Sequence, residues 1–200
     1  MLLSLPSGAS LPVTLSVPGE YNIENALAAA TAADFCGVAP FDIARGLSGF
    51  QGAARRMEYR GMACGARIFE DYAHHPTEIA AAIAAAKGLC AETGRVFVVF
   101  QPHTYSRTAA LFSDFCHALR EAHRVIVTDI YAAREIDTLD MSGECLAAGI
   151  GGNAAFGDSL SSTVSLLLEE LSAGDVVLVM GAGDIGRIFR EFSRKGFTIL

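Results

Sequence analysis

Three short apolar runs set the strongest limit on what this chain can fold into. The runs are RVFVVF at 95–100, RVIVTDI at 124–130 and DVVLVM at 175–180. Helical patterns alternate with them, at 76–91, 106–121, 142–149 and 159–172, and a weak strand pattern lies at 154–156. Strands that are apolar on both faces and alternate with helices are typical of a parallel sheet covered on both sides. The pattern therefore predicts an α/β fold with a parallel sheet.

The first part of the chain follows a different pattern. An alternating segment at 11–17 predicts a strand, and Ala-rich 22–36 and the following 40–50 predict two helices. Two further strands are expected between Arg55 and Ala73, around Gly61 and Gly65. Because the composition changes between residues 60 and 67, we expect a domain boundary there.

Composition excludes several classes of function. The chain has 15 Lys and Arg against 22 Asp and Glu, a net charge of -7, so neither a nucleic-acid surface nor an anionic-membrane surface is expected. With 52% hydrophobic and 18% charged residues, it predicts a globular protein with a large core. No apolar run is long enough to cross a membrane. Five cysteines without a CxxC pair indicate reduced, mostly buried, structural thiols and a cytoplasmic location.

Polar side chains gather after three of the predicted strands. EDYAHHPTE follows the strand at 66–70, QPHTYSRT follows 95–100, and DIYAARE includes the end of 124–130. Because ligands bind at the carboxyl ends of strands in such sheets, these clusters predict one shared site. Arg107, with His103 and Tyr105, suits a carboxylate ligand. The alternative is that Ser106 caps a helix and Arg107 is solvated.

Other polar positions leave two interpretations open. Asn22 and Asn25 lie three apart on one predicted helix face, where they indicate either a helix cap or recognition of a polar group such as a purine edge. Arg55 and Arg56 follow a Gly-containing loop, where they are either solvated or beside a phosphate.

Two motif matches do not support the function that they first suggest. GAGDIG at 181–186 has the GxGxxG spacing, but only fourteen residues follow it, so no complete dinucleotide-binding unit fits. We expect a tight strand-to-helix turn instead. In HHPTE, the two histidines are adjacent rather than four apart, so no metal site is expected at His74, His75 and Glu78.

Taken in order, these segments resemble the Mur ligase family, ATP-dependent enzymes that add amino acids to the bacterial peptidoglycan precursor. The segments that carry the resemblance are VPGEYNIENALAAATAA, FQGAARRMEYRG, EDYAHHPTEI, VFQPHTYSRTAALFSDF, DIYAARE and MGAGDI. HHPTE, QPHTYSRT and GAGDI are most similar to the members that add L-alanine to UDP-N-acetylmuramate. Tyr21 stands where many members carry His, and Thr104 where many carry a second Arg.

The resemblance implies a role for eight residues. The adenine of ATP would contact Asn22 and Asn25, and the rest of the nucleotide would contact Arg56 and Asp71. The L-alanine pocket would be lined by Tyr72, His74, His103 and Arg107, with Arg107 on the carboxylate. No catalytic residue is assigned within this chain.

The resemblance also implies a domain organisation. Residues 1–62 would be the end of the central ATPase domain, and 63–200 a Rossmann-like carboxy-terminal domain with a mostly parallel sheet and helices on both faces. Since no GxxxxGK[ST] occurs, the phosphate-binding loop and the Mg²⁺ ligands are expected elsewhere, in a longer protein or the other product of a split gene. We expect this chain to be inactive alone.

Two alternatives remain at this stage. One is a recycling ligase that attaches a murein tripeptide to the same sugar, which shares HHPT but is not expected to carry QPHTYSRT. The other is a non-catalytic ligand-binding domain, which an upstream phosphate-binding loop would exclude.

Overall fold

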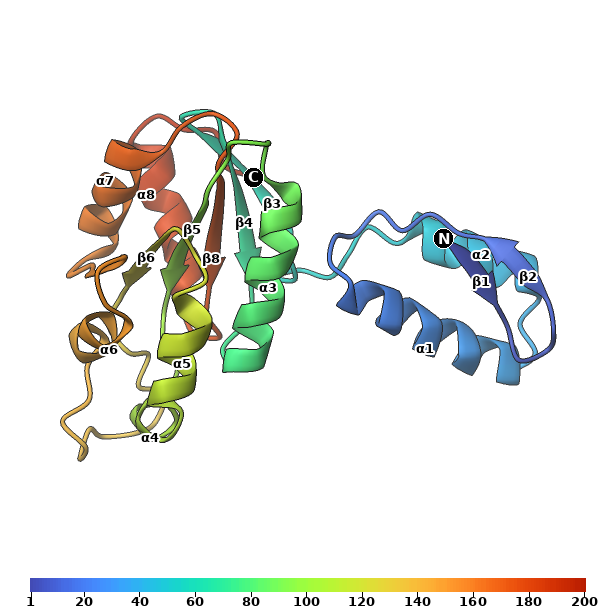
Figure 1. The fold of residues 1–200 in the computed structure, drawn as a ribbon, viewed down its shortest axis with the longest axis horizontal. Coiled ribbons are helices and arrows are strands. Elements are labelled where there is room, and N and C mark those ends of the chain that lie inside the picture. The colour runs from blue at the N-terminus through green and yellow to red at the C-terminus, as the bar shows by residue number, and fades with distance from the viewer. The chain divides into compact units, whose positions relative to one another are not determined.

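The computed structural model describes residues 1–200. A six-stranded sheet forms the centre of the unit Arg55–Leu200 (Figure 1). Its strands are β3 (Glu58–Ala63), β4 (Ala66–Asp71), β5 (Val96–Phe100), β6 (Arg124–Val127), β7 (Ala154–Phe156) and β8 (Val176–Met180). Their order across the sheet is β3-β4-β8-β5-β6-β7. β3 is antiparallel to β4, and all other neighbours are parallel. The predicted α/β fold with a mostly parallel sheet is confirmed.

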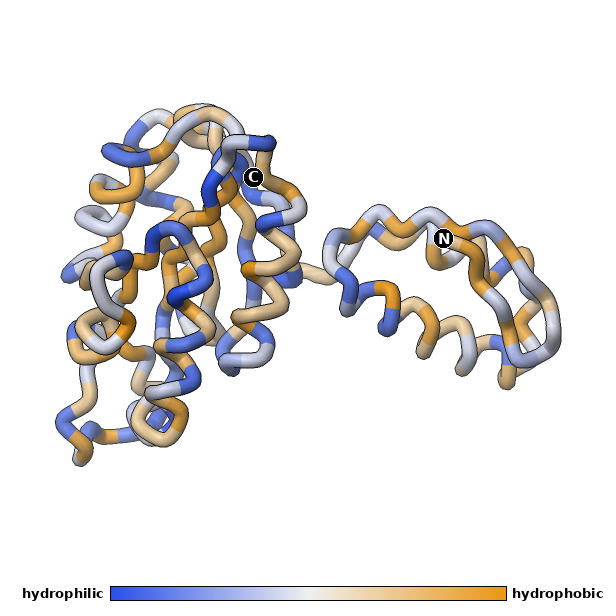
Figure 2. The backbone as a smooth tube through the Cα atoms, in the orientation of Figure 1, coloured by the Kyte–Doolittle hydropathy of each residue, from blue (hydrophilic) through white to orange (hydrophobic).

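Helices cover both faces of this sheet. One face packs against α3 (Pro76–Leu89), α5 (Phe112–Leu119) and α6 (Gly143–Ile150), and the other against α7 (Leu160–Glu170) and α8 (Ile188–Arg194). Alternate side chains of a strand point to opposite faces. Val98 of β5 therefore joins the first core, and Phe97 and Val99 join the second. The apolar strands appear as orange tube segments in the interior (Figure 2).

The order of the strands is not their order in the chain. β8, the last strand, lies between β4 and β5, so that Met180 pairs with both Asp71 and Phe100. This insertion places the loop after β8 between the loops that follow β4 and β5. It therefore positions the candidate site.

The first 54 residues form a separate compact unit, Met1–Ala54, and the second unit is Arg55–Leu200. The first unit contains an antiparallel pair, β1 (Leu2–Ser4) and β2 (Ser10–Pro12), and two helices, α1 (Tyr21–Phe35) and α2 (Pro40–Gly49). Its small core consists of Leu3, Leu5, Val13, Ala30 and Ile43.

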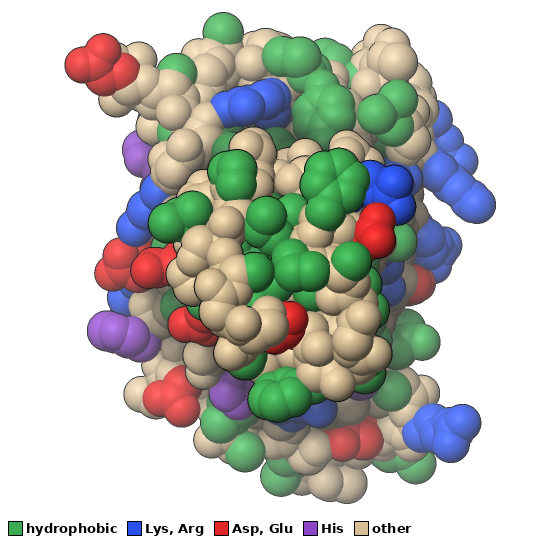
Figure 3. Space-filling view, turned by 90° about the vertical axis from the view of Figure 1, so that its right-hand side faces the viewer, with side chains coloured by type: hydrophobic (Ala, Val, Ile, Leu, Met, Phe, Trp, Pro, Cys, Tyr) green, Lys and Arg blue, Asp and Glu red, His purple; other side chains and the backbone are tan.

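Large hydrophobic side chains of this first unit remain exposed: Leu2, Ile23, Leu27, Phe35, Val38, Phe41 and Phe50. Hydrophobic side chains are visible as green atoms across the face shown in Figure 3. Apolar exposure of this kind is typical of a surface that another segment or protein covers.

Several sequence predictions need correction or stay open. Only Cys116 is buried among the five cysteines, and three of the others are exposed. The strand predicted at 124–130 ends at Val127. The strand predicted at 11–17 is shorter in the structure and spans only Ser10–Pro12. Its partner strand β1 was not predicted, because the existence of such short strands depends on their hydrogen bonds to each other. The predicted helix 106–121 is two helices, α4 (Tyr105–Ala110) and α5, because the backbone of Leu111 is not helical. The break leaves α4 at the sheet edge while Phe115 and Leu119 of α5 enter the core. The assignment of 1–62 and 63–200 to two ligase domains stays a prediction. None of the helices combines the length and apolar character needed to cross a membrane.

Candidate functional site

Several strands end at one edge of the sheet, and the loops that follow them contact one another. β4 and β8 end at Asp71 and Met180, and β5 ends beside β8 at Phe100. Main-chain pairing continues past these ends: the Gln101 N–H donates to the Met180 carbonyl at 2.9 Å, and the Gly181 N–H donates to the Asp71 carbonyl at 3.2 Å. Ligands of parallel α/β sheets bind at this edge, which makes it the candidate site.

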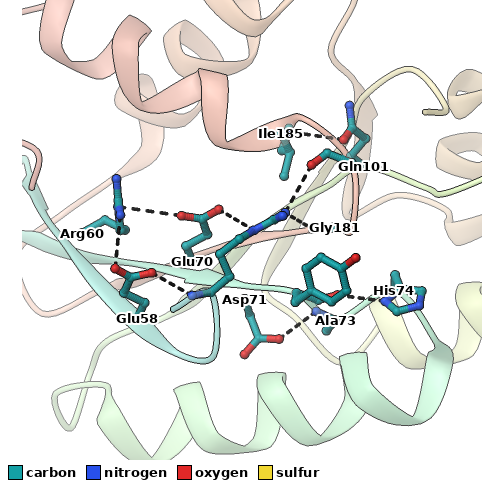
Figure 4. Close-up of polar contacts among 12 residues, drawn as sticks. Glu58, Arg60, Glu70, Asp71, Ala73, His74, Gln101, Gly181 and Ile185 are labelled. Atoms are coloured by element: carbon teal, nitrogen blue, oxygen red, sulfur yellow. Dashed lines mark hydrogen bonds and ion pairs between the residues drawn. The ribbon is translucent and has the colours of Figure 1, made fainter. Parts of the chain in front are cut away.

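Asp71 is buried, and both of its carboxylate oxygens accept a main-chain hydrogen bond. The Met57 N–H donates to Oδ2 and the Ala73 N–H to Oδ1, each at 2.8 Å. Burial raises the pKa of Asp71 above its ordinary value, and these hydrogen bonds and the charge of Arg56 oppose the rise. The carboxylate thus holds the turn before β3 against the end of β4 (Figure 4). Its nucleotide contact stays a prediction.

The adjacent arginines of this turn have different surroundings. Arg55 (φ 57°) and Met57 (φ 47°) are both left-handed, which is uncommon for residues other than Gly. The Arg55 Nε lies 2.9 Å from Oε1 of Glu70, and its Nη2 donates to the Gly181 carbonyl at 2.6 Å. Arg56, between the two left-handed residues, is exposed and makes no ion pair. Arg55 therefore joins the turn to the loop after β8. The guanidinium carbon of Arg56 lies over the Tyr72 ring, 5.6 Å from its centroid, and its ligand contact stays a prediction.

A charged cluster continues from Arg55 along β3 and β4 (Figure 4). The Arg60 Nη1 lies 3.3 Å from Oε1 of Glu58, and the Arg60 Nε lies 3.8 Å from Oε2 of Glu70. Burial raises the pKa of Glu70, although the charges of both arginines oppose the rise. These contacts fix the edge of the sheet next to the site.

Aromatic rings from three loops form a continuous row along the site. The ring centroids of Tyr72 and His74, after β4, are 5.3 Å apart. The His74 centroid lies 6.0 Å from that of His103, after β5. The His103 centroid lies 5.5 Å from that of Tyr131, after β6. The structure thus brings three predicted pocket residues together, and it adds Tyr131, which the sequence reasoning did not single out.

The two histidines of the row are in different environments. The Nδ1 atom of His74 lies 2.9 Å from the Tyr72 carbonyl, and because a carbonyl only accepts, this nitrogen carries the proton. The His103 Nδ1 is buried without a hydrogen-bond partner. Burial and the positive charges of Arg107 and His74 lower the pKa of His103, and Glu135 partly opposes this. These surroundings therefore favour the neutral form of His103.

Arg107 lies on the six-residue helix α4, next to this row. Thr104, which precedes α4, has a left-handed backbone (φ 67°) and provides no side-chain cap. The alternative interpretation of Ser106 as the N-cap is wrong, because Ser106 is inside the helix and its N–H and hydroxyl donate to Glu135. Arg107 makes no ion pair within the chain, so its guanidinium is available to an anion.

The remaining predicted residues, Asn22 and Asn25, belong to the first unit. The Asn22 Nδ2 donates to the Pro18 carbonyl at 2.6 Å, and the Asn25 Nδ2 lies 3.4 Å from the Asn22 Oδ1. The N-cap of α1 is Glu20, so Asn22 is not its cap. The two amides form a small polar pair on the first turn of α1.

Gln101 is a further residue that the sequence reasoning missed. Its Oε1 accepts from the Ile185 N–H at 3.1 Å (Figure 4). Its Nε2 donates to Oδ1 of Asp184 at 2.9 Å. A Cβ on Gly183 would lie 2.5 Å from both the Gln101 Oε1 and the Tyr131 ring. The GAGDIG segment is therefore a tight turn packed on the neighbouring loops, as expected. The available signal was that Gln101 directly follows a buried strand.

Two other features of the structure do not contribute to this site. No group of three or more His, Cys, Asp or Glu side chains is arranged to hold a metal ion. A cavity of about 410 Å³ opens at the opposite edge of the sheet. Its lining residues Lys87 and Arg95 are already paired with Glu121 and Asp175. The carboxyl edge therefore remains the better candidate.

Comparison with known proteins identifies relatives of the chain. The family model described as Mur ligase, glutamate ligase domain, matches residues 55–183. A UDP-N-acetylmuramate–L-alanine ligase of Mycolicibacterium smegmatis is 43% identical over 188 residues, which are 92% of this chain and 39% of that protein. The chain thus spans about two fifths of the length of this relative.

Solved structures show the same relationship. The UDP-N-acetylmuramate–alanine ligase of Thermotoga maritima matches with a TM-score of 0.76 and 27% identity, over 98% of this chain and 44% of that chain. A murein peptide ligase of Psychrobacter arcticus matches with a TM-score of 0.64 and 25% identity, over 93% of this chain and 39% of that chain.

Proposed function

Because this chain belongs to the Mur ligase family, we propose that it forms the carboxy-terminal part of an ATP-dependent ligase that adds L-alanine to UDP-N-acetylmuramate in peptidoglycan synthesis. The names of its relatives support this substrate pair. In this proposal, residues 1–62 end the central ATPase domain and 63–200 form the carboxy-terminal domain. The complete enzyme works in the cytoplasm.

The observation that carries the proposal is an unpaired arginine beside a row of aromatic rings. Arg107 provides the planar guanidinium that binds a carboxylate with two parallel hydrogen bonds. Arg107 would supply the positive charge beside the His103 ring, whose pKa it helps to lower. The rings of Tyr72, His74 and His103 would line the space beside it, where the small side chain of alanine fits.

The nucleotide would be held by the second predicted group. Asn22 and Asn25 present amides suited to a purine edge, and Arg56 is an exposed cation suited to a phosphate. Asp71 connects the Arg56 turn to the amino-acid pocket, because its carboxylate accepts from Met57 next to Arg56. In this proposal, Arg56 and Asp71 would hold the nucleotide near the amino-acid pocket.

The reaction proposed for the complete enzyme has two steps. The muramoyl carboxylate attacks the γ-phosphorus of ATP, so that an acyl phosphate forms and ADP leaves. The alanine amine then attacks the acyl carbon, the C–N bond forms, the C–O bond to phosphate breaks, and the amine loses its proton. The residues of this chain would contribute by positioning the amine and neutralising charge. The chain shows no carboxylate set suited to Mg²⁺, and none of its residues is assigned to that ion.

The substrate dependence of ADP release in the complete ligase tests this function. With ATP and UDP-N-acetylmuramate, we expect release that requires L-alanine. Release that requires a murein tripeptide instead would favour the recycling ligase. No ADP release with either amine would contradict both ligase functions and leave a non-catalytic ligand-binding domain.

A further inference from the structure

The loop between β6 and α6 follows the edge of the candidate site. The Tyr131 N–H donates to the Pro102 carbonyl at 2.8 Å, and the Thr104 N–H donates to the Tyr131 carbonyl at 2.9 Å. His103 and Tyr131 thereby form a parallel bridge that extends the pairing of β5 and β6 beyond the strands. The position of the β6 loop is thus tied to the segment that carries His103.

Farther along this loop, Glu135 contacts the start of α4. Its carboxylate accepts from the Ser106 N–H at 2.9 Å and from the Ser106 hydroxyl at 2.5 Å. Because Thr104 gives α4 no side-chain cap, Glu135 satisfies a first-turn N–H that a cap would otherwise bind. A negative charge at this end also complements the helix dipole.

The backbone on both sides of this contact is unusual. Ala133 (φ 55°) and Thr104 (φ 67°) are both left-handed, a conformation that is costly for residues with a Cβ. Ala133 lies within a turn in which the Glu135 N–H donates to the Ala132 carbonyl at 2.9 Å. This turn brings Glu135 back to Ser106. Such strain persists only where surrounding contacts hold it. The Glu135–Ser106 pair joins the two strained segments through a side chain, in addition to the main-chain hydrogen bond from Thr104 to Tyr131.

We propose that Glu135 is a positioning residue of the amino-acid pocket: its carboxylate fixes the first turn of α4 and thereby the orientation of Arg107 and His103. This inference rests on the function proposed above. Arg107 follows Ser106 directly, and His103 precedes the strained Thr104. Thr104 cannot provide a second guanidinium, so carboxylate binding depends on one correctly oriented arginine. Glu135 acts through Ser106 and does not itself contact the substrate.

Steady-state kinetics of the complete ligase test this role with a double-mutant cycle. Replacing Glu135 by Ala should raise KM for L-alanine roughly fivefold to thirtyfold, the effect of losing a charged helix-cap contact, with little change in KM for ATP. Glu135→Gln keeps one acceptor and should show a smaller effect. In an Arg107→Ala background, Glu135→Ala should add much less than it does alone, because only His103 remains for it to orient. Glu144→Gln changes an exposed first-turn acid of α6 and should leave both KM values unchanged.

Two results would overturn the inference. One is an unchanged KM for L-alanine in a folded Glu135→Ala variant while Arg107→Ala still raises it. The other is full additivity of the two substitutions, which indicates independent or general structural effects. Failure of the proposed function is distinguishable, because the unsubstituted ligase would then show no L-alanine dependence at all. NMR titration of His103 in the 200-residue chain gives an independent measurement: Glu135→Gln should lower its pKa, and an unchanged pKa would count against the contact.

Discussion

Replacing Arg107 by Ala tests whether this arginine binds the substrate or is only solvated. Arg107 makes no ion pair, so its removal leaves no carboxylate without a partner. The side chain lies on a six-residue helix at the edge of the sheet, outside both cores. We therefore expect the free energy of unfolding to change by less than about 0.5 kcal/mol, as for surface substitutions.

The effect on substrate binding should be much larger. A hydrogen-bonded pair between ionised groups contributes about 1.5–3 kcal/mol, and each 1.4 kcal/mol is a factor of ten. Thr104 carries no charge that could compensate. KM for L-alanine in the complete ligase should therefore rise about tenfold to a hundredfold, while KM for ATP stays nearly constant. Arg107→Lys keeps the charge without the planar fork, so its effect should be intermediate.

The assay combines kinetics with two measurements of structure. Kinetics with varied L-alanine and a thermal melt should be compared with Arg190→Ala, which removes an exposed arginine of α8 away from the pocket. The pKa of His103 should rise in Arg107→Ala, because the charge of Arg107 contributes to lowering it. A folded Arg107→Ala enzyme with unchanged L-alanine dependence would refute the pocket assignment, and Arg107 would then be a solvated helix residue.

Three further predictions concern the chain by itself. The 200-residue chain should release no ADP, because it lacks GxxxxGK[ST], and release that depends on UDP-N-acetylmuramate would contradict this. Hydrogen exchange should be slowest in β5 and β8, whose residues are all buried, and equal protection of α1 would argue against this ranking. Asp175→Asn should lower the free energy of unfolding at pH 7 by about 2–4 kcal/mol in chemical denaturation, because it leaves Arg95 without its buried partner. Burial alone would raise the pKa of Asp175, but hydrogen bonds from Arg95 and Ser172 hold it below its ordinary value. The ionised Asp175 therefore contributes to the free energy of unfolding at neutral pH, and this contribution is lost as pH falls below about 4. Acid should then reduce the stability of Asp175→Asn less than that of the parent chain. Equal acid sensitivity of the two proteins would count against this pair.

The sheet and most of its helices could be predicted from sequence because their signals are local. The apolar runs predicted the bounds of β5 and β8 to within one residue. The weak strand predicted at 154–156 is β7. The break at Leu111 was not predictable, because the apolar spacing continues through it and the change of direction depends on where α5 meets the sheet.

The candidate site was predicted in part. Tyr72, His74 and His103 come together because each follows a strand that ends at the same edge. The polar clusters predicted at this edge also contain Gln101, Tyr131 and Glu135, but the sequence does not show which residues of a cluster make the contacts. Their roles depend on contacts with segments 28 to 84 residues away in sequence.

The sequence by itself determined the α/β class and the edge of the sheet where polar groups meet, because strands buried on both faces require apolar runs and parallel strands share one carboxyl edge. Only the tertiary structure decided that β8 lies between β4 and β5, since that pairing joins segments about a hundred residues apart. It also decided that Arg55 turns inward to Glu70 and Gly181 while Arg56 stays exposed. Adjacent arginines are chemically identical in sequence, and only the left-handed turn that Asp71 holds in place gives them different surroundings.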